Sequence, residues 1–250
     1  MTSPLPSSSP RLSNRRLYWI LLLGSLLVAL LPVFWPQLDV AMAGLFLRPE
    51  PIIGAAQWQW VIWVNEYLPD AFRTVGLLAL AAWGVLTLLR RFTSMRWLSR
   101  LHPRTTLVLA FFGFAMLLGP GLVTWAAKEH TLRARPFHVT EFGGERQFTP
   151  ALEATQQCVD NCAFPSGHVA CGFFFVSLML IDPRRRWRWI TLGVVAGALV
   201  SLARISVGAH WLSDAIWTLP IDLASSGVVW RILCWIYPRE VTHPLSNATP

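Results

Sequence analysis

Three short segments of the chain carry residue types suited to phosphate chemistry, and the first is Phe164–His168, with the sequence Phe-Pro-Ser-Gly-His. It precedes an apolar run that ends at Ile181. A helix that starts after such a turn presents backbone N–H groups without intrahelical partners, and its dipole adds positive charge. Ser166 adds a hydroxyl group, and Gly167 permits close approach of the backbone. The segment therefore predicts an anion site with the imidazole of His168 at its edge. A capped helix with an incidental histidine is the alternative.

The other two segments supply cations and a second imidazole. Their relevant residues are Lys128 and Arg135 in the first, and Arg204, His210 and Asp214 in the second. The spacing of four between His210 and Asp214 places both on one face of a helix, so the carboxylate can accept from one ring nitrogen. The other nitrogen is then free to act as a nucleophile.

Together these residues predict a complete phosphoryl-transfer site. Three cations and a helix N-terminus bind the phosphate and stabilise the charge on its oxygens during transfer. His168 is left to protonate the departing oxygen as a general acid. The sequence shows no acidic cluster that would hold Mg²⁺ or Ca²⁺. We therefore expect chemistry that needs no metal and no cofactor and that passes through a phosphohistidine.

The composition is typical of a membrane protein. Of the 250 residues, 54% are hydrophobic and only 14% are charged, which is too few for an ordinary soluble surface. The net charge of +8 comes from clustered arginines rather than from a stripe that would fit nucleic acid. We expect the bilayer, and no nucleic acid, as a partner.

Apolar runs long enough to cross a bilayer predict an all-α polytopic bundle with about six transmembrane helices. The predicted spans are 17–35, 74–89, 105–127, 167–181, 189–207 and 211–237. Residues 1–16 are predicted to be a disordered cytoplasmic tail, 17–237 the membrane domain and 238–250 a polar C-terminal tail. The tryptophan-rich stretch 57–64 is predicted to be an interfacial helix. Gly119-Pro120-Gly121 is predicted to kink the third span.

Arginine-rich loops at 90–104 and 183–188, together with the basic N-terminal tail, predict the orientation. Positive charge favours the cytoplasmic side, so both termini are expected inside. The three phosphate-binding segments then lie on the outer face. In a Gram-negative cell that face is the periplasm.

Cys158 and Cys162 lie in the long loop that would face this outer compartment. A metal site would need more ligands at defined spacings, whereas an oxidising compartment favours a local disulfide.

The order and spacing of the three segments resemble the type 2 phosphatidic acid phosphatase superfamily. The first segment has Lys, six residues, then Arg-Pro; the second is Pro-Ser-Gly-His; the third has Arg, five residues, His, three residues, then Asp. The resemblance implies that the phosphate is bound by Lys128, Arg135, Ser166, Gly167 and Arg204. It implies His168 as the general acid and the pair His210 and Asp214 as the nucleophile. One departure is Ala203, where the family usually has serine, so one hydrogen bond to the phosphate or to Arg204 is missing or is supplied by another group.

The resemblance further implies a multi-pass protein of the bacterial inner membrane that acts on a lipid phosphate or diphosphate in the outer leaflet. Undecaprenyl diphosphate, lipid A, phosphatidylglycerol phosphate and phosphatidic acid remain open as substrates. The related vanadium-dependent haloperoxidases resemble soluble proteins, which six spans argue against.

Other functions and nearby residues leave alternatives open. A transporter or binding protein for a phosphorylated lipid would need the cations but not the pairing of His210 with Asp214, and intramembrane Asp222 would suit transport. A carboxylate satisfied by its neighbours is the other interpretation of Asp222. A phosphotransferase that uses a lipid diphosphate donor is a further alternative. Near the first segment, a solvated loop is favoured over head-group contact for His130, Arg133, His138 and Arg146.

Overall fold

The computed structural model describes residues 12–48, 54–96, 98, 101–102 and 104–242. This part of the chain is helical, apart from turns and one isolated bridge between Val139 and Arg146. Its α-helices are α1 (Asn14–Phe34), α2 (Gln37–Leu47), α3 (Gln59–Phe92), α4 (Thr105–Met116), α5 (Thr124–Thr131), α6 (Gly167–Ser177), α7 (Arg186–Ser206), α8 (Leu212–Ile216), α9 (Thr218–Ile236) and α10 (Pro238–Thr242). A π-helical segment, η3 (Leu117–Val123), joins α4 to α5, and short 3₁₀ turns lie at 55–57, 136–138, 140–142 and 183–185.

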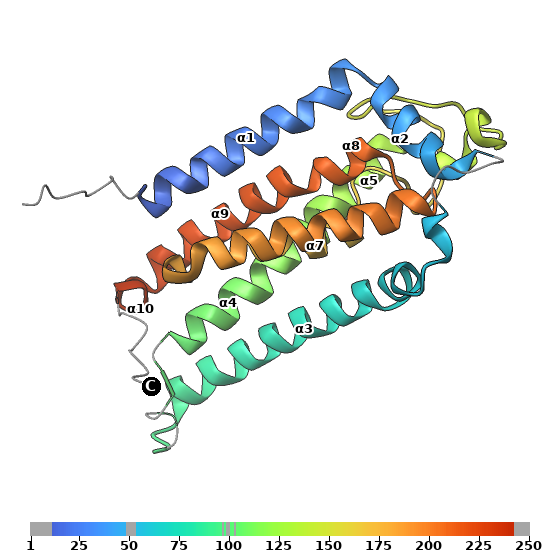
Figure 1. Ribbon diagram of the computed structural model, residues 1–250. Coiled ribbons are helices and arrows are strands. Elements are labelled where there is room, and N and C mark those ends of the chain that lie inside the picture. Colours follow the sequence, from blue (N-terminus) through green and yellow to red (C-terminus); the bar gives the residue numbers. More distant parts are fainter. Residues whose placement is uncertain (1–11, 49–53, 97, 99–100, 103, 243–250) are drawn as a thin grey trace, which may run out of the picture.

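The long helices run side by side along the length of the molecule (Figure 1). Within the described residues, five helical stretches are long and apolar enough to cross a membrane. They are α1, α3, α4 with its continuation, α7 with the turn before it, and α8 with α9. The structure is therefore a polytopic helical membrane bundle, as the sequence predicts.

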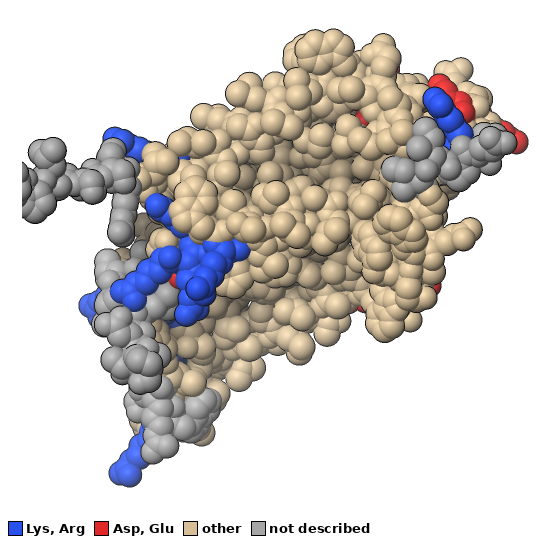
Figure 2. Space-filling view, in the orientation of Figure 1, with Lys and Arg blue, Asp and Glu red and all other residues tan. Residues whose placement is uncertain are grey.

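Charged side chains are concentrated at the ends of the bundle. Figure 2 shows blue side chains gathered at the end where α1 and α7 begin, and a broad middle zone of the visible face with few charged residues. At the opposite end lie α2, α5, α8 and the long loop between α5 and α6 (Figure 1). An uncharged belt between two charged ends is the surface that a bilayer requires.

The first and second spans are longer than the sequence predicts. α1 begins at Asn14, where the Ser13 hydroxyl caps it by accepting from the Arg16 N–H, so the helix starts before the predicted boundary at residue 17. Residues 1–11 and 243–250, which include most of both predicted tails, lie outside the described residues. The predicted interfacial helix 57–64 is wrong, because Gln59–Val64 forms the first turns of the 34-residue α3.

The Gly119-Pro120-Gly121 triplet sits inside η3. Proline removes one backbone donor from the helical ladder, and the helix has π-helical hydrogen bonding around Pro120. The Thr124 hydroxyl donates to the Gly119 carbonyl at 3.0 Å, which satisfies one of the acceptors in this segment.

α6 is the central helix and is shorter than predicted. The predicted span 167–181 is α-helical only over Gly167–Ser177, and turns continue it to Ile181. Most of its side chains are buried, including Phe174 and Val176.

α6 packs very closely on α7. A Cβ atom added at Gly172 would lie 2.8 Å from the Cα atom of Gly197. Small residues at such a crossing let two backbones touch, which is the usual way in which membrane helices associate. The contact fixes the start of α6, which carries His168, relative to the end of α7, which carries Arg204.

Candidate active site

Ser166, Gly167 and His168, which the sequence predicts to form an anion cradle, lie at the N-terminus of α6. Ser166 is the N-cap residue, is fully buried, and accepts a hydrogen bond from the Val169 N–H at 3.4 Å. Gly167 is the first helical residue, and His168 follows it. The Nε2 atom of His168 lies 3.3 Å from the backbone oxygen of Asn65 in α3. Because a carbonyl can only accept, Nε2 carries the proton in this contact.

His210 lies in the turn between α7 and α8 and is almost completely buried. Its Nδ1 atom is 2.7 Å from the Ala163 oxygen, so Nδ1–H donates to that carbonyl. This contact fixes the tautomer and leaves the Nε2 lone pair available for attack on phosphorus.

The predicted direct pairing of His210 with Asp214 is looser than expected. The Asp214 Oδ2 atom is 3.6 Å from Nδ1, which is too long for a hydrogen bond. The carbonyl of Ala163, immediately before the Phe-Pro-Ser-Gly-His segment, orients His210 instead. The carboxylate remains close enough to stabilise positive charge that develops on the ring during attack.

Burial and nearby cations keep His210 neutral. The pKa of His210 lies well below its usual value, first because of burial and then because of Lys128, Arg204, Arg135 and His168. The three cations and His168 thus lie within electrostatic reach of His210. A neutral imidazole is the form that attacks phosphate.

Asp214 belongs to a buried ion-pair network that the sequence did not reveal. Arg133 donates to its Oδ1 atom at 2.6 Å and to Oδ2 of Asp39 in α2 at 2.7 Å. Ser213 donates to both oxygens of Asp39, from its N–H at 2.7 Å and its hydroxyl at 2.6 Å. The Trp211 N–H donates to Oδ2 of Asp214 at 2.7 Å. Every charge in the network thus has a partner, as burial requires.

This network corrects the prediction of a solvated loop for Arg133. Its side chain is buried, and its guanidinium also lies 5.4 Å from the ring centre of Trp211. The neighbouring His130, His138 and Arg146 are exposed. Asp39 and Arg133 are separated by 94 positions in the sequence, so no local spacing could have paired them.

The three cations that are predicted to bind phosphate contact different parts of the chain. Lys128 donates to the Cys162 carbonyl, and Arg135 donates to the Asn161 carbonyl at 2.9 Å. Arg204 donates to the side-chain oxygen of Asn65. Two cations therefore anchor the loop before the cradle, and the third is anchored to α3.

Cys158 and Cys162 are joined by a disulfide in this loop. The bridge closes the segment whose carbonyls receive Lys128 and Arg135, so it limits the motion of both acceptors. Cys171 and Cys234 are free thiols within the helices.

Asp222 in α9 is buried, and neither of its oxygens has a hydrogen-bond partner among the described residues. The interpretation of Asp222 as a carboxylate that is satisfied by its neighbours is therefore wrong. A Cβ atom added at Gly119 would lie 3.1 Å from its Oδ1 atom, so the carboxylate faces η3.

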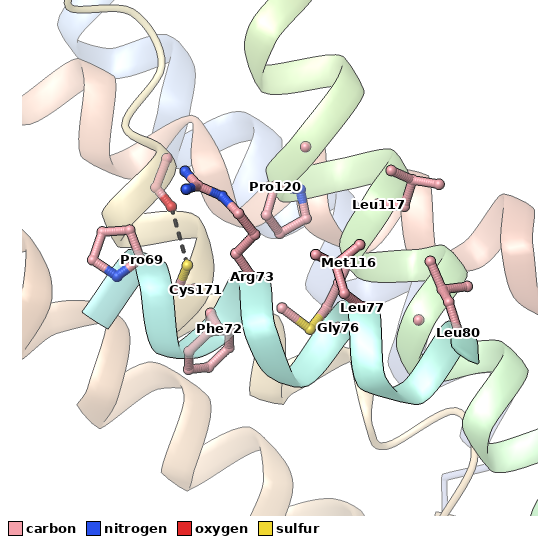
Figure 3. A pocket seen from close by; sticks show the side chains of 13 residues that line it. Pro69, Phe72, Arg73, Gly76, Leu77, Leu80, Met116, Leu117, Pro120 and Cys171 are labelled. Carbon is pink, nitrogen blue, oxygen red and sulfur yellow. Dashed lines mark hydrogen bonds between the residues drawn. The ribbon is translucent and has the colours of Figure 1, made fainter. Parts of the chain in front are cut away.

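A lateral pocket of about 330 Å³ lies beside the start of α6. It is lined by α3, by α4 with η3, and by the start of α6, including Gly167 and Cys171. Figure 3 shows Phe72, Leu77, Met116 and Leu117 around it, with Arg73 extending toward the turn that carries the cradle. The pocket can hold hydrocarbon beside an anion site.

No group of three or more His, Cys, Asp or Glu side chains in the described part of the chain is placed to hold a metal ion. The site that these residues build can bind an anion, attack it with one imidazole and exchange a proton through another. Those are the operations of metal-independent phosphoryl transfer.

The chain is similar to known lipid phosphatases. Over 208 residues the chain is 26% identical to a lipid A 4'-phosphatase of Francisella tularensis subsp. novicida, covering 80% of this chain and 88% of that protein. It is 27% identical over 203 residues to phosphatidylglycerophosphatase B of Escherichia coli, covering 70% and 80%. An undecaprenyl-diphosphatase of Sulfolobus acidocaldarius is 44% identical over 82 residues, which are 28% of this chain and 37% of that protein. The chain has no significant match among solved structures.

The model of the PAP2 superfamily matches residues 108–238, which is more than half of the chain and includes all three phosphate-binding segments. The chain therefore belongs to the PAP2 superfamily and is a membrane-embedded phosphoric-ester hydrolase that acts on lipid phosphates.

Proposed function

We propose that this phosphatase hydrolyses a phosphate monoester of a membrane lipid through a covalent intermediate on His210. The observation that carries the proposal is the arrangement of His210. Its Nδ1 is bonded to Ala163, its Nε2 is left free, and Lys128, Arg135 and Arg204 lie within electrostatic reach.

The first chemical step forms a bond from Nε2 of His210 to phosphorus and breaks the bond from phosphorus to the lipid oxygen. His168 gives a proton to that oxygen, and the lipid alcohol leaves. The three cations and the N–H groups at the start of α6 stabilise the charge on the three remaining phosphoryl oxygens.

The second step releases inorganic phosphate. Water attacks phosphorus while His168 accepts a proton from it, and the bond from phosphorus to Nε2 breaks. This restores the neutral imidazole of His210 and the protonated His168. One water is consumed for each lipid alcohol and each phosphate that are released.

Lipid A is the substrate that we propose first. The Francisella lipid A 4'-phosphatase is aligned over 88% of its own length, whereas the undecaprenyl-diphosphatase is aligned over 37%. The lateral pocket beside Gly167 supports a lipid substrate of any of the candidate classes, because it offers an apolar wall next to the phosphate cradle.

We propose that the site faces the periplasm or cell exterior. The disulfide between Cys158 and Cys162 lies in the loop that anchors Lys128 and Arg135, and disulfides persist in oxidising compartments. The basic residues gathered at the opposite end of the bundle suit the cytoplasmic side (Figure 2).

Phosphate release from four lipids in detergent micelles tests the substrate. Lipid A, phosphatidylglycerol phosphate, undecaprenyl diphosphate and phosphatidic acid are compared by kcat/KM, with His210→Ala as the inactive control. We expect the highest value for lipid A. A higher value for another lipid would move the assignment to that class, and no release from any of them would contradict the proposed hydrolysis. Measuring lipid binding by His210→Ala would then separate a carrier from an enzyme.

A further inference from the structure

Asn65 contacts two catalytic groups from a helix that carries none of the three phosphate-binding segments. Its backbone oxygen lies 3.3 Å from Nε2 of His168, and its side-chain oxygen accepts a hydrogen bond from Arg204. His168 is 103 positions away in the sequence and Arg204 is 139 positions away. α3 is therefore tied to both the general acid and a phosphate-binding cation.

The backbone oxygen of Asn65 is available because of Pro69. Inside an α-helix each carbonyl normally accepts from the N–H four residues later. Four residues after Asn65 stands Pro69, which lies inside α3 and has no N–H to donate. The Asn65 carbonyl thus has no helical partner at that position, and His168 takes the place of the missing donor.

The contact with Asn65 favours the form of His168 that the chemistry needs. A carbonyl oxygen accepts a proton from nitrogen but cannot donate one, so it stabilises an imidazole that is protonated at Nε2. The imidazolium, which is the acid that protonates the departing oxygen, always satisfies this condition. The carbonyl also fixes the plane of the ring.

The side-chain amide of Asn65 compensates for Ala203. The resemblance led us to expect a serine at that position, as a partner for Arg204 or the phosphate. Because a guanidinium only donates, the amide must turn its oxygen toward Arg204, and its nitrogen then carries two donors with no protein partner among the described residues. Those donors are available to a phosphate oxygen.

We infer that Asn65 and Pro69 are positioning residues for the reaction, with a different role for each. The Asn65 backbone carbonyl, freed by Pro69, orients His168 for proton transfer. The Asn65 side chain orients Arg204 for phosphate binding. Pro69 also lines the lateral pocket (Figure 3), so it lies in the wall that the lipid chain would contact. The inference rests on the proposed function.

Pro69→Ala tests the backbone role. The new alanine N–H competes with His168 for the Asn65 carbonyl, so proton donation should weaken. We expect kcat on an alkyl phosphate, whose leaving group needs a proton, to fall about tenfold. The kcat on p-nitrophenyl phosphate, whose leaving group does not, should change little. Pro32→Ala, at the internal proline of α1, is the matched control. An equal loss on both substrates, or the same result for Pro32→Ala, would refute the role of Pro69.

Asn65→Ala tests the side-chain role, because it removes the amide and leaves the backbone carbonyl in place. Calorimetry should show orthovanadate binding about tenfold more weakly, the effect of losing one hydrogen bond to a charged group. The ratio of kcat on the two substrates should stay at the wild-type value. The exposed neighbour Glu66 supplies the control Glu66→Gln.

The crossed pattern separates this inference from the proposed function. Pro69→Ala should leave vanadate affinity unchanged, and Asn65→Ala should leave the leaving-group ratio unchanged. Unaltered vanadate binding in Asn65→Ala, with an active wild type, would refute the inference alone. An inactive wild type that still binds vanadate would refute the proposed function, while the vanadate comparison would still test Asn65.

Discussion

At the scale of single residues, the cations around the two imidazoles influence the protonation of both. His210 is neutral because it is buried and surrounded by Lys128, Arg204 and Arg135. The same cations bind the substrate, and the phosphate dianion then neutralises their charge. The empty site thus favours a free nucleophile, and the occupied site favours a protonated His168.

Removing one of these cations should shift the pH dependence. The lowered pKa of His210 keeps the nucleophile deprotonated as the pH falls below its usual range. In Lys128→Met the pKa of His210 should rise toward 6.5, so activity should be lost at a higher pH. The acid limb of kcat/KM against pH should therefore move upward, whatever the loss in absolute rate.

The control for this prediction is Glu129→Gln, which changes an exposed neighbouring charge. Its acid limb should coincide with that of the wild type. An acid limb for Lys128→Met that stays in place or moves downward would show that Lys128 does not set the protonation of His210.

Local sequence identifies the candidate catalytic side chains but not the residues that hold them in place. Lys128, His168, Arg204 and His210 are recognisable because each motif has an internal spacing. Their partners are single polar residues in other helices, such as Asn65, 139 positions from Arg204. A lone asparagine or arginine has no local signal of this kind, and only the packing of α2 and α3 against the site reveals its role.

At the scale of helices, the α6–α7 contact aligns the two halves of the site. The absence of side chains at Gly172 and Gly197 lets the backbones approach, and this crossing positions His168 beside Arg204. Gly172 lies about one helical turn from His168 along α6, and Gly197 lies about two turns from Arg204 along α7.

Adding one methyl group at this crossing should destabilise the bundle. In Gly172→Ala the new Cβ would lie 2.8 Å from backbone atoms of α7, which cannot move aside as a side chain can. We expect a loss of about 1–3 kcal/mol in the free energy of unfolding. Gly84→Ala is the matched control, because nothing lies within 4 Å of its new Cβ.

Thermal unfolding in detergent measures both variants. Gly84→Ala should unfold at or slightly above the wild-type temperature, since alanine is favoured over glycine in a helix interior by up to about 1 kcal/mol. Equal midpoints for the two variants would mean that the α6–α7 contact is not tight.

Hydrophobic runs located the helices well but not their ends. The stretch 57–64 was separated from the span that follows it because polar residues such as Asn65 and Glu66 interrupt the apolar run. In the structure Asn65 turns inward to Arg204, so the helix continues through it. α6 is shorter than its apolar run. A helix that is enclosed by other helices is apolar on all sides, so its sequence resembles that of a helix that crosses the whole membrane.

At the scale of the whole molecule, the candidate site and the arginine-rich loops lie at opposite ends. The ends of the helices that carry Lys128, His168 and Arg204 meet at the end where α2 and α8 lie, and the basic residues at the start of α7 lie at the other end (Figures 1 and 2). The sequence predicted this segregation, since it follows from the alternation of arginine-rich loops along the chain.

A reporter fusion tests which end faces outward. Alkaline phosphatase, which folds only outside the cytoplasm, should be active when fused after Glu145 and inactive when fused after Arg186. Fusion of a fluorescent protein that folds only in the cytoplasm should give the reverse pattern. An active alkaline phosphatase after Arg186 would place the catalytic end in the cytoplasm and exclude outer-leaflet lipids as substrates.

The measurement that tests the central claim most directly is rapid-quench labelling with a substrate that carries labelled phosphorus. The geometry of His210, with Nδ1 bonded to Ala163 and Nε2 free, predicts an acid-labile label on this residue in the wild type. His210→Ala should give neither label nor turnover. His168→Ala should still accept label from p-nitrophenyl phosphate, and should accept it about 10² to 10⁴ times more slowly from an alkyl phosphate. Label on His168 in the wild type, or equal labelling of His210→Ala, would contradict the account.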